Sequence, residues 1–411
     1  MTDTDWIHAS LIAARPQAVG ALLRWFRDLD TAEEAYQEAC LRALKAWPQN
    51  GPPRDPTGWL IFVGRNAALD RVRKDSRLDA LQDGSAPSDL DDEEAAVADR
   101  IDGGDYRDDV LRLLFVCCQP DLPATQQIAL ALRIVSGLTV SQIARPFLVS
   151  EAAMEQRITR AKARIANAGV PFETPGPVER VERFAAVAAI LYLMFNEGYS
   201  AAGNPDAASL CDEAIRLARL LLKLFPAEPE MMGLLALMLL QHARAAARFD
   251  ATGEAILLDD QDRSRWDPSM IGEALALIDK AMRHRKPGPY QVQAAIAALH
   301  ARAGSPDETD WAQIDLLYAT LERLEPSPVV TLNRAIAVAK VAGPEAALAM
   351  IDPLGDRLDG YFHFHGARGG LLLQLGRRAE ARMAFDRAIA LARTPAQATH
   401  IRAHLDRLTS S

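Results

Sequence analysis

The sequence has few cysteines and no long apolar run, and each absence excludes a class of protein. The cysteines are Cys40, Cys117, Cys118 and Cys211, with no C-x-x-C spacing among them. Neighbouring residues such as Cys117 and Cys118 do not readily form a relaxed disulfide, which favours reduced thiols and a cytoplasmic location. The longest apolar runs, residues 184–195 and 231–240, are shorter than the roughly 18 residues that a membrane-spanning helix needs.

Positive charge is not in excess either. The 411 residues include 46 Lys and Arg against 55 Asp and Glu, a formal net charge of −9. This excludes a uniformly basic coat for nucleic acid, so any contact with DNA must be local. The chain starts without a basic stretch leading into an apolar one, and we expect no signal peptide.

Motifs of catalysis are also missing. The sequence shows no P-loop, no nucleophile elbow and no Rossmann glycine pattern, so we expect no catalytic residues and no cofactor. The carboxylates of residues 259–267 lack the spacing of an EF-hand, and we expect an ion-paired structural loop there rather than a metal site. A helical-repeat hydrolase stays open as an enzyme alternative.

Apolar residues recur at helical spacing along most of the chain, which predicts an all-α fold. Twelve acidic residues and two arginines lie between Asp79 and Asp109. With the glycines and Pro87 among them, they indicate a flexible acidic linker. Three prolines in residues 169–177 mark a second break. These breaks divide the chain into residues 1–78, the linker 79–107, residues 108–168 and an extension, 178–411.

The extension has the pattern of stacked helical hairpins. We expect helices over 366–375 and 379–391, joined by a turn at Gly376, with Ala381, Phe385 and Ala388 packing as in a tetratricopeptide repeat. A similar unit is expected upstream, with helices over 329–341 and 345–351 and a turn at Gly343. The two turns lie close to one repeat length apart, which favours a TPR-like helical-repeat domain.

Residues 138–164 have the pattern of a helix-turn-helix. Thr139 is placed to cap a short first helix, and Ser150 to cap a second one. The second helix carries Ser150, Gln156, Arg157, Arg160, Lys162 and Arg164, the residues that we expect to contact DNA. Such a face can bind phosphates and base edges in a major groove. The alternative is a solvated cationic face on an ordinary surface helix.

The N-terminal segment carries a second constellation. Residues 31–44 predict an amphipathic helix with an exposed acidic and amide face at Glu33, Glu34, Gln37 and Glu38. A later helix, from Thr57, is apolar first and then polar and basic. Its Trp59, Arg65, Asn66, Arg71, Arg73 and Lys74 combine an aromatic ring with cations, which suits unstacked bases and their backbone. A buried Trp59 beside a solvated basic turn is an equal alternative.

The order of these pieces resembles bacterial extracytoplasmic-function (ECF) sigma factors of the sigma-70 family. Residues 31–43 and 59–73 are similar to two family motifs, and residues 138–162 to the promoter-reading helix-turn-helix. Four further segments, 195–199, 259–267, 287–296 and 326–335, resemble the ECF subgroup with a C-terminal tetratricopeptide-like extension.

The resemblance implies a subunit that binds core RNA polymerase and directs it to promoter DNA. Residues 1–78 would be sigma region 2, with Glu33, Glu34, Gln37 and Glu38 on the polymerase clamp helices. The basic and aromatic face from Trp59 to Lys74 would hold the −10 element. Residues 108–168 would be sigma region 4, whose helix-turn-helix would read the −35 element, and the flap of the polymerase is a second expected contact.

Two questions stay open from the sequence. The extension could regulate the chain in cis or bind a protein or peptide partner. The main rival to a sigma factor is a helix-turn-helix regulator with a TPR-like sensor domain, which would bind duplex DNA tightly without polymerase.

Overall fold

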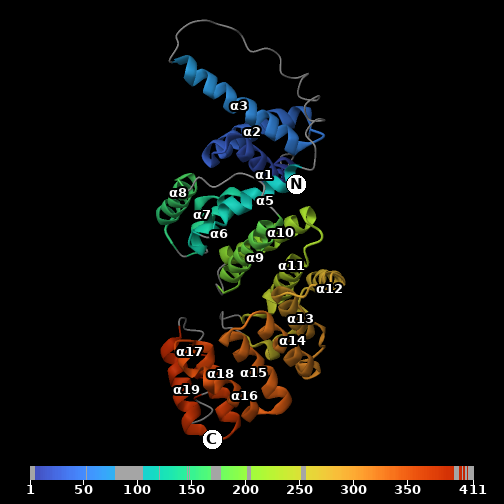
Figure 1. The fold of residues 1–411 in the computed structure, drawn as a ribbon, viewed down its shortest axis with the longest axis vertical. Coiled ribbons are helices and arrows are strands. Elements are labelled where there is room, and N and C mark those ends of the chain that lie inside the picture. The colour runs from blue at the N-terminus through green and yellow to red at the C-terminus, as the bar shows by residue number, and fades with distance from the viewer. Residues whose placement is uncertain are drawn as a thin grey trace. The chain divides into compact units, whose positions relative to one another are not determined.

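A computed structural model describes the chain from residue 5 to residue 405, except residues 52, 79–104, 120, 146, 148, 168–176, 201–204, 251–255, 393–397, 400 and 403–404. Within these described residues the regular elements are helices, as predicted, and there is no β-strand (Figure 1). The chain divides into two compact units, Met1–Phe225 and Pro226–Ser411. Most of the predicted acidic linker, 79–104, lies outside the described residues.

The α-helices of the first unit are α1 (Asp5–Phe26), α2 (Leu29–Asn50), α3 (Pro56–Leu78), α5 (Asp105–Cys117), α6 (Ala124–Ile134), α7 (Val140–Ala144), α8 (Glu151–Asn167), α9 (Pro177–Ser200) and α10 (Pro205–Leu224). Helices α1, α2 and α3 pack pairwise. Asp28 begins α2 by accepting hydrogen bonds from the backbone N and the hydroxyl of Thr31, at 2.7 and 2.6 Å. A Cβ at Gly64 would lie 2.9 Å from the carbonyl oxygen of Ala35, so α2 and α3 approach closely because this residue has no side chain.

Helices α5 to α8 form the second part of the first unit. Helix α5 packs against α1 and α6, and α8 packs against α6 and α7. The predicted cap at Thr139 is present as a capping box: its hydroxyl accepts from the backbone N of Gln142 at 3.2 Å, and the Gln142 side chain accepts from the Thr139 N at 2.9 Å. The predicted cap at Ser150 is also present, with its hydroxyl accepting from Ala153 N at 3.2 Å. Local sequence therefore sets both helix starts.

Helices α9 and α10 pack against each other, and α9 also contacts α5 and α6. The rings of Phe184 and Phe225 meet edge to face, with centroids 5.1 Å apart. The first helices of the predicted extension therefore belong to the same compact unit as residues 5–167, and the chain separates into its two units only after Phe225.

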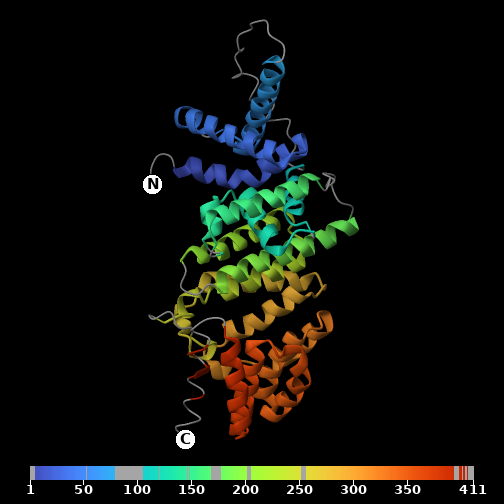
Figure 2. The same cartoon turned by 90° about the vertical axis from the view of Figure 1, so that its left-hand side faces the viewer.

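The α-helices of the second unit are α11 (Pro229–His242), α12 (Pro268–Arg283), α13 (Pro289–Arg302), α14 (Trp311–Leu324), α15 (Pro328–Ala342), α16 (Pro344–Ile351), α17 (Gly355–Leu358), α18 (Phe362–Gln374) and α19 (Arg378–Leu391). Neighbours in sequence pack as pairs, among them α14 with α15, α15 with α16, and α18 with α19. Figure 2 shows these helices from a second side, turned by 90°.

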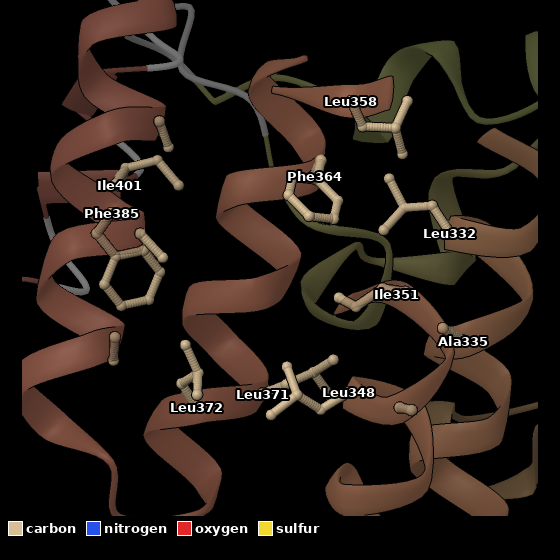
Figure 3. Packing of buried hydrophobic residues seen from close by; sticks show 14 residues of the cluster. Leu332, Ala335, Leu348, Ile351, Leu358, Phe364, Leu371, Leu372, Phe385 and Ile401 are labelled. Carbon is tan, nitrogen blue, oxygen red and sulfur yellow. The ribbon is translucent and has the colours of Figure 1, made fainter. Parts of the chain in front are cut away.

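The predicted hairpins lie in this unit, within a few residues of their expected bounds. Gly343 ends α15 and Gly376 precedes α19. Their φ angles are positive, 92° and 72° respectively, which glycine adopts at little cost. Leu332, Leu348, Phe364, Leu372 and Phe385 fill the core between the pairs (Figure 3). Ala381 and Ala388 are buried beside Phe385, in the small and large packing that the sequence indicates.

The loop before α12 is structural. Asp267 caps α12 by accepting from Ser269 N and Met270 N, and Asp262 accepts from Ser264 N. Arg263 donates to the carbonyl oxygens of His300 and Ala303, at 2.7 and 2.6 Å, and so satisfies the end of α13. None of the described helices is long and apolar enough to cross a membrane.

Candidate functional site

Helix α8 presents a polar face opposite a buried one. Met154, Ile158, Ala161 and Ile165 are buried against the rest of the first unit. On the other side Ser150, Gln156, Arg160 and Arg164 are exposed, and Arg157 is half-buried. This is the orientation that the helix-turn-helix prediction requires of these residues, whereas Lys162 is directed elsewhere.

Two arginines of α8 line a hollow on this surface. Arg160 is ordered along the helix, with Nε donating to the Gln156 carbonyl oxygen at 3.2 Å and Nη2 to Gln156 Oε1 at 3.1 Å. Arg160, Arg164 and Gln126 of α6 line an open hollow of about 360 Å³. Two guanidinium groups beside one hollow have the positive charge and the N–H donors that recognition of a phosphate requires.

Lys162 behaves differently from its neighbours on α8. Its Nζ donates to Asp30 Oδ1 at 2.6 Å and to Glu33 Oε2 at 2.8 Å, and its side chain is 18% exposed. Burial disfavours the ammonium, but the hydrogen bonds to Asp30 and Glu33 outweigh that effect, so the pKa of Lys162 lies above its ordinary value. In this arrangement Lys162 is directed at α2 and not at solvent.

The predicted exposure of Glu33 is wrong. Glu33 is 5% exposed, and besides Lys162 it accepts a hydrogen bond from Arg15 Nη2 at 3.0 Å and lies 3.7 Å from Arg133 Nε. Three cations from α1, α6 and α8 surround this carboxylate, which offsets the cost of burying it. Sequence periodicity missed this because Glu33 lies at the edge of the polar face of α2 and its partners are distant in sequence.

The rest of the predicted acidic and amide face is exposed. Glu34, Gln37 and Glu38 face solvent on α2, and Glu38 pairs with Arg42 at 3.1 Å. The same stripe continues into two apolar residues that the sequence analysis did not single out, Leu41 and Leu44, with exposed fractions of 56% and 39%. The exposed stripe of α2 is therefore acidic and amide toward its beginning and apolar toward Leu44.

The aromatic residues of α1 to α3 place Trp59 between the two alternatives that the sequence left open. Trp59 is half-buried, with its ring edge to face on buried Trp47 at 5.4 Å, and Trp47 stacks on Trp6. Trp25 is 57% exposed instead, and Arg65 Cζ lies 4.6 Å from the centre of its ring. Trp25 is therefore an exposed aromatic residue beside a predicted DNA-binding cation. The sequence analysis did not single it out because it lies among apolar residues of α1.

The remaining predicted residues of α3 are only partly placed. Asn66 is half-buried, two residues before the end of the described side chains of this helix. The side chains of Arg71, Arg73 and Lys74 lie outside the described residues, although their backbone belongs to α3.

Known families match three parts of the chain. Residues 11–78 match Sigma-70 region 2, and residues 113–165 match Sigma-70 region 4. Residues 183–282 match a family of unknown function.

Individual proteins also match the chain, over all or part of its length. An uncharacterized protein of Rhizobium meliloti (strain 1021) is 71% identical over 412 residues, covering all of this chain and 97% of its own length. The Mycobacterium tuberculosis (strain ATCC 25618 / H37Rv) protein named probable ECF RNA polymerase sigma factor SigI is 30% identical over 168 residues. That match covers 40% of this chain and 56% of SigI, so it spans little more than half of that relative.

The two matched regions contain the two constellations described above, in the same order. Region 2 contains α1 to α3 with the acidic stripe and the Trp25–Arg65 pair, and region 4 contains the capped helix-turn-helix of α7 and α8. Sigma domains of this kind indicate a non-catalytic transcription factor. The chain therefore carries region 2 and region 4 of the sigma-70 family in order, which supports an RNA polymerase sigma factor.

Proposed function

We propose that this sigma factor is of the ECF type, that it binds core RNA polymerase through α2, and that it directs the polymerase to promoters in the cytoplasm. The observation that carries the proposal is the outward cationic face of α8, on a capped helix-turn-helix, in a chain that also matches region 2. The likeness to SigI, itself named a probable ECF sigma factor, supports the subtype.

Different helices bind the two promoter elements. Ser150, Gln156, Arg157, Arg160, Lys162 and Arg164 of α8 and its cap bind the −35 element. Trp59, Arg65, Asn66, Arg71, Arg73 and Lys74 of α3 bind the −10 element, and we add Trp25 because its ring is exposed beside Arg65. Exposed rings next to cations suit a single strand, whose bases have free faces to stack.

Core polymerase docks on the exposed stripe of α2. Glu34, Gln37 and Glu38 supply polar contacts to the clamp helices, with Leu41 and Leu44 as apolar neighbours. Glu33 contributes only indirectly, because its carboxylate is buried beneath this stripe and is already paired with cations.

Polymerase binding tests this assignment directly. We expect the purified chain to co-elute with core RNA polymerase from a sizing column, and the Gln37→Arg/Glu38→Arg double variant to lose at least tenfold in affinity. Arg54→Glu, an exposed charge reversal beyond α2, is the control and leaves the affinity unchanged. Tight binding to duplex DNA by a chain with no affinity for polymerase would instead support the polymerase-independent regulator.

The extension modulates this activity in cis or through a bound protein or peptide. A truncation that tests this should remove residues 226–411 and not 178–411, because α9 packs on α5 and α6 within the first unit. We expect the truncated chain to bind polymerase but to give a different transcript yield from the full chain. Equal yields would contradict a regulatory role.

A further inference from the structure

Arg263, in the loop before α12, has two sides that differ in their partners. Its Nη1 has a structural role, since it donates to the carbonyl oxygens of His300 and Ala303. Its Nε and Nη2 are buried, and neither has a hydrogen-bond partner within the described part of the chain. A buried N–H group without an acceptor costs free energy, and a charged one costs more. This side of the guanidinium therefore requires an acceptor of another origin.

The two unpartnered nitrogens form an edge of the guanidinium that carboxylates bind. Nε–H and Nη2–H are parallel, so this edge can donate to both oxygens of one carboxylate. Arg216 uses it to bind Glu213, with distances of 2.8 and 2.6 Å. Arg377 binds Glu380 in the same way, at 2.7 and 2.6 Å. Among the described residues no carboxylate occupies this edge of Arg263, so the matching group is an oxyanion from outside them.

Two residues in contact with Arg263 carry further buried nitrogens of this kind. Trp266 is 5% exposed, and its ring centre lies 5.0 Å from Arg263 Cζ. Its Nε1–H has no acceptor among the residues that the structure describes. The same holds for Nδ1 of His300, the residue of α13 whose carbonyl oxygen Arg263 binds. The guanidinium and the indole can only donate, and a set of donors without acceptors fits an anion.

The charges that act on His300 favour an anion at the same place. Burial lowers the pKa of His300 to about 4, and the positive charges of Arg244 and Arg263 contribute in the same direction. Asp259 opposes them by raising this pKa. The imidazole is therefore neutral near pH 7, and the two arginines make the local potential positive.

Aromatic rings and an exposed ion pair border this cluster. The ring of His300 meets Trp311 edge to face, with centroids 5.3 Å apart, and Lys340 Nζ lies 5.4 Å from the centre of the Trp311 ring. Lys340 also lies 3.7 Å from Asp259, and about half of each side chain is exposed. An exposed pair of this kind contributes little stability, so it can open at small cost and admit a ligand.

We propose that Arg263, Trp266 and His300 form a binding site for a small monocarboxylic acid with an apolar remainder. The carboxylate accepts from Nε and Nη2 of Arg263 and from Nε1 of Trp266, and the rings of Trp266 and Trp311 suit the apolar part. A monocarboxylate is favoured over a phosphate because a second buried negative charge would lack compensation. The site lies within the second unit and does not depend on the proposed sigma function.

The indole N–H of Trp266 is a direct probe of occupancy. Its resonance, assigned by its loss in Trp266→Phe, is followed by NMR in the full chain labelled with nitrogen-15 tryptophan, at constant ionic strength. Acetate and benzoate are titrated as carboxylates of two sizes, and acetamide and benzamide as their neutral counterparts. We expect at least one carboxylate to give a saturable shift and its amide to bind at least tenfold more weakly.

Arg263→Lys separates the two sides of the guanidinium. Lysine keeps a cation for the carbonyl oxygens of His300 and Ala303 but lacks the parallel pair of donors. We expect this variant to bind the carboxylate at least tenfold more weakly, whereas Arg265→Lys, at an exposed position of the same loop, binds it unchanged. Circular dichroism checks that both variants remain folded.

Trp266→Phe is a second variant, which tests the site even where Arg263→Lys fails to fold. It removes the indole donor and keeps an aromatic ring. Because the resonance of Trp266 is lost with it, isothermal titration calorimetry measures the affinity. We expect the carboxylate to bind at least threefold more weakly than in the unchanged chain.

Four results would overturn the proposal. One is the absence of a saturable shift with either carboxylate, which would leave these nitrogens to ordered water. The others are equal affinity for a carboxylate and its amide, equal affinity of Arg263→Lys and Arg265→Lys, and inorganic phosphate bound as tightly as the carboxylates. None of these measurements uses polymerase or DNA, so failure here is distinct from failure of the proposed sigma function, which the polymerase-binding experiment detects.

Discussion

Lys162 and Glu33 lie 2.8 Å apart, between the helix that the sequence assigns to DNA and the helix that it assigns to polymerase. Around this pair, Arg15 and Arg133 supply further positive charge to the same buried carboxylate. Removing Glu33 would therefore take a carboxylate partner away from Lys162, Arg15 and Arg133 at once.

Glu33→Ala should destabilise the first unit by about 3 kcal/mol, because breaking a buried ion-paired network by removing one partner leaves uncompensated charge. Hydrogen exchange of α1 and α2 amides measures the loss as a free energy of opening. Gln37→Ala, on the exposed face of the same helix, should change that free energy by no more than about 0.5 kcal/mol. A similar small effect at both positions would show that the cluster contributes little.

Arg160→Ala and Arg164→Ala should each weaken binding to duplex DNA, since both guanidinium groups line one exposed hollow. Each lost phosphate contact should lower the slope of log affinity against log salt by about 1. Titrations of a duplex at several salt concentrations measure this slope. Lys45→Ala removes an exposed cation from α2 and should leave the slope unchanged. An equal loss of slope in all three variants would mean that the net charge of the protein, and not the hollow, determines binding.

Trp25→Ala should weaken binding to a single-stranded oligonucleotide by about 1–3 kcal/mol, the contribution of one stacked base. The ring is exposed, so the protein should keep its stability. Trp25→Phe retains a face for stacking and should recover part of the affinity. Fluorescence anisotropy of a labelled oligonucleotide measures binding, and an unchanged affinity of Trp25→Ala would remove this residue from the DNA-binding face.

Two adjacent glycines of α18 should respond in opposite directions. A Cβ at Gly369 would lie 2.6 Å from the ring of Phe385, whereas one at Gly370 meets nothing within 4 Å. Gly369→Ala should therefore destabilise the second unit by about 1–3 kcal/mol through overpacking. Gly370→Ala should stabilise it by about 0.5–1 kcal/mol because alanine favours the helix. Hydrogen exchange of α18 and α19 distinguishes the two, and equal signs would contradict the packing.

Local signals in the sequence predicted the helices well and their long-range contacts poorly. The capping residues Thr139 and Ser150 and the glycine turns at Gly343 and Gly376 act within a few residues, so a sequence pattern contains them. The burial of Glu33 depends on Lys162, more than a hundred positions away, which no helical periodicity encodes. The exposure of Trp25 was missed for a related reason, since an aromatic residue in an apolar helix is usually core.

The central claim, that this chain directs RNA polymerase to promoters, is tested most directly by run-off transcription. Purified core polymerase and the full chain are combined on a template carrying the DNA upstream of its own gene. The account predicts a discrete transcript that depends on this protein and that the Gln37→Arg/Glu38→Arg variant fails to produce. No dependent transcript from that template or from those of neighbouring genes, together with no binding to core polymerase, would contradict it.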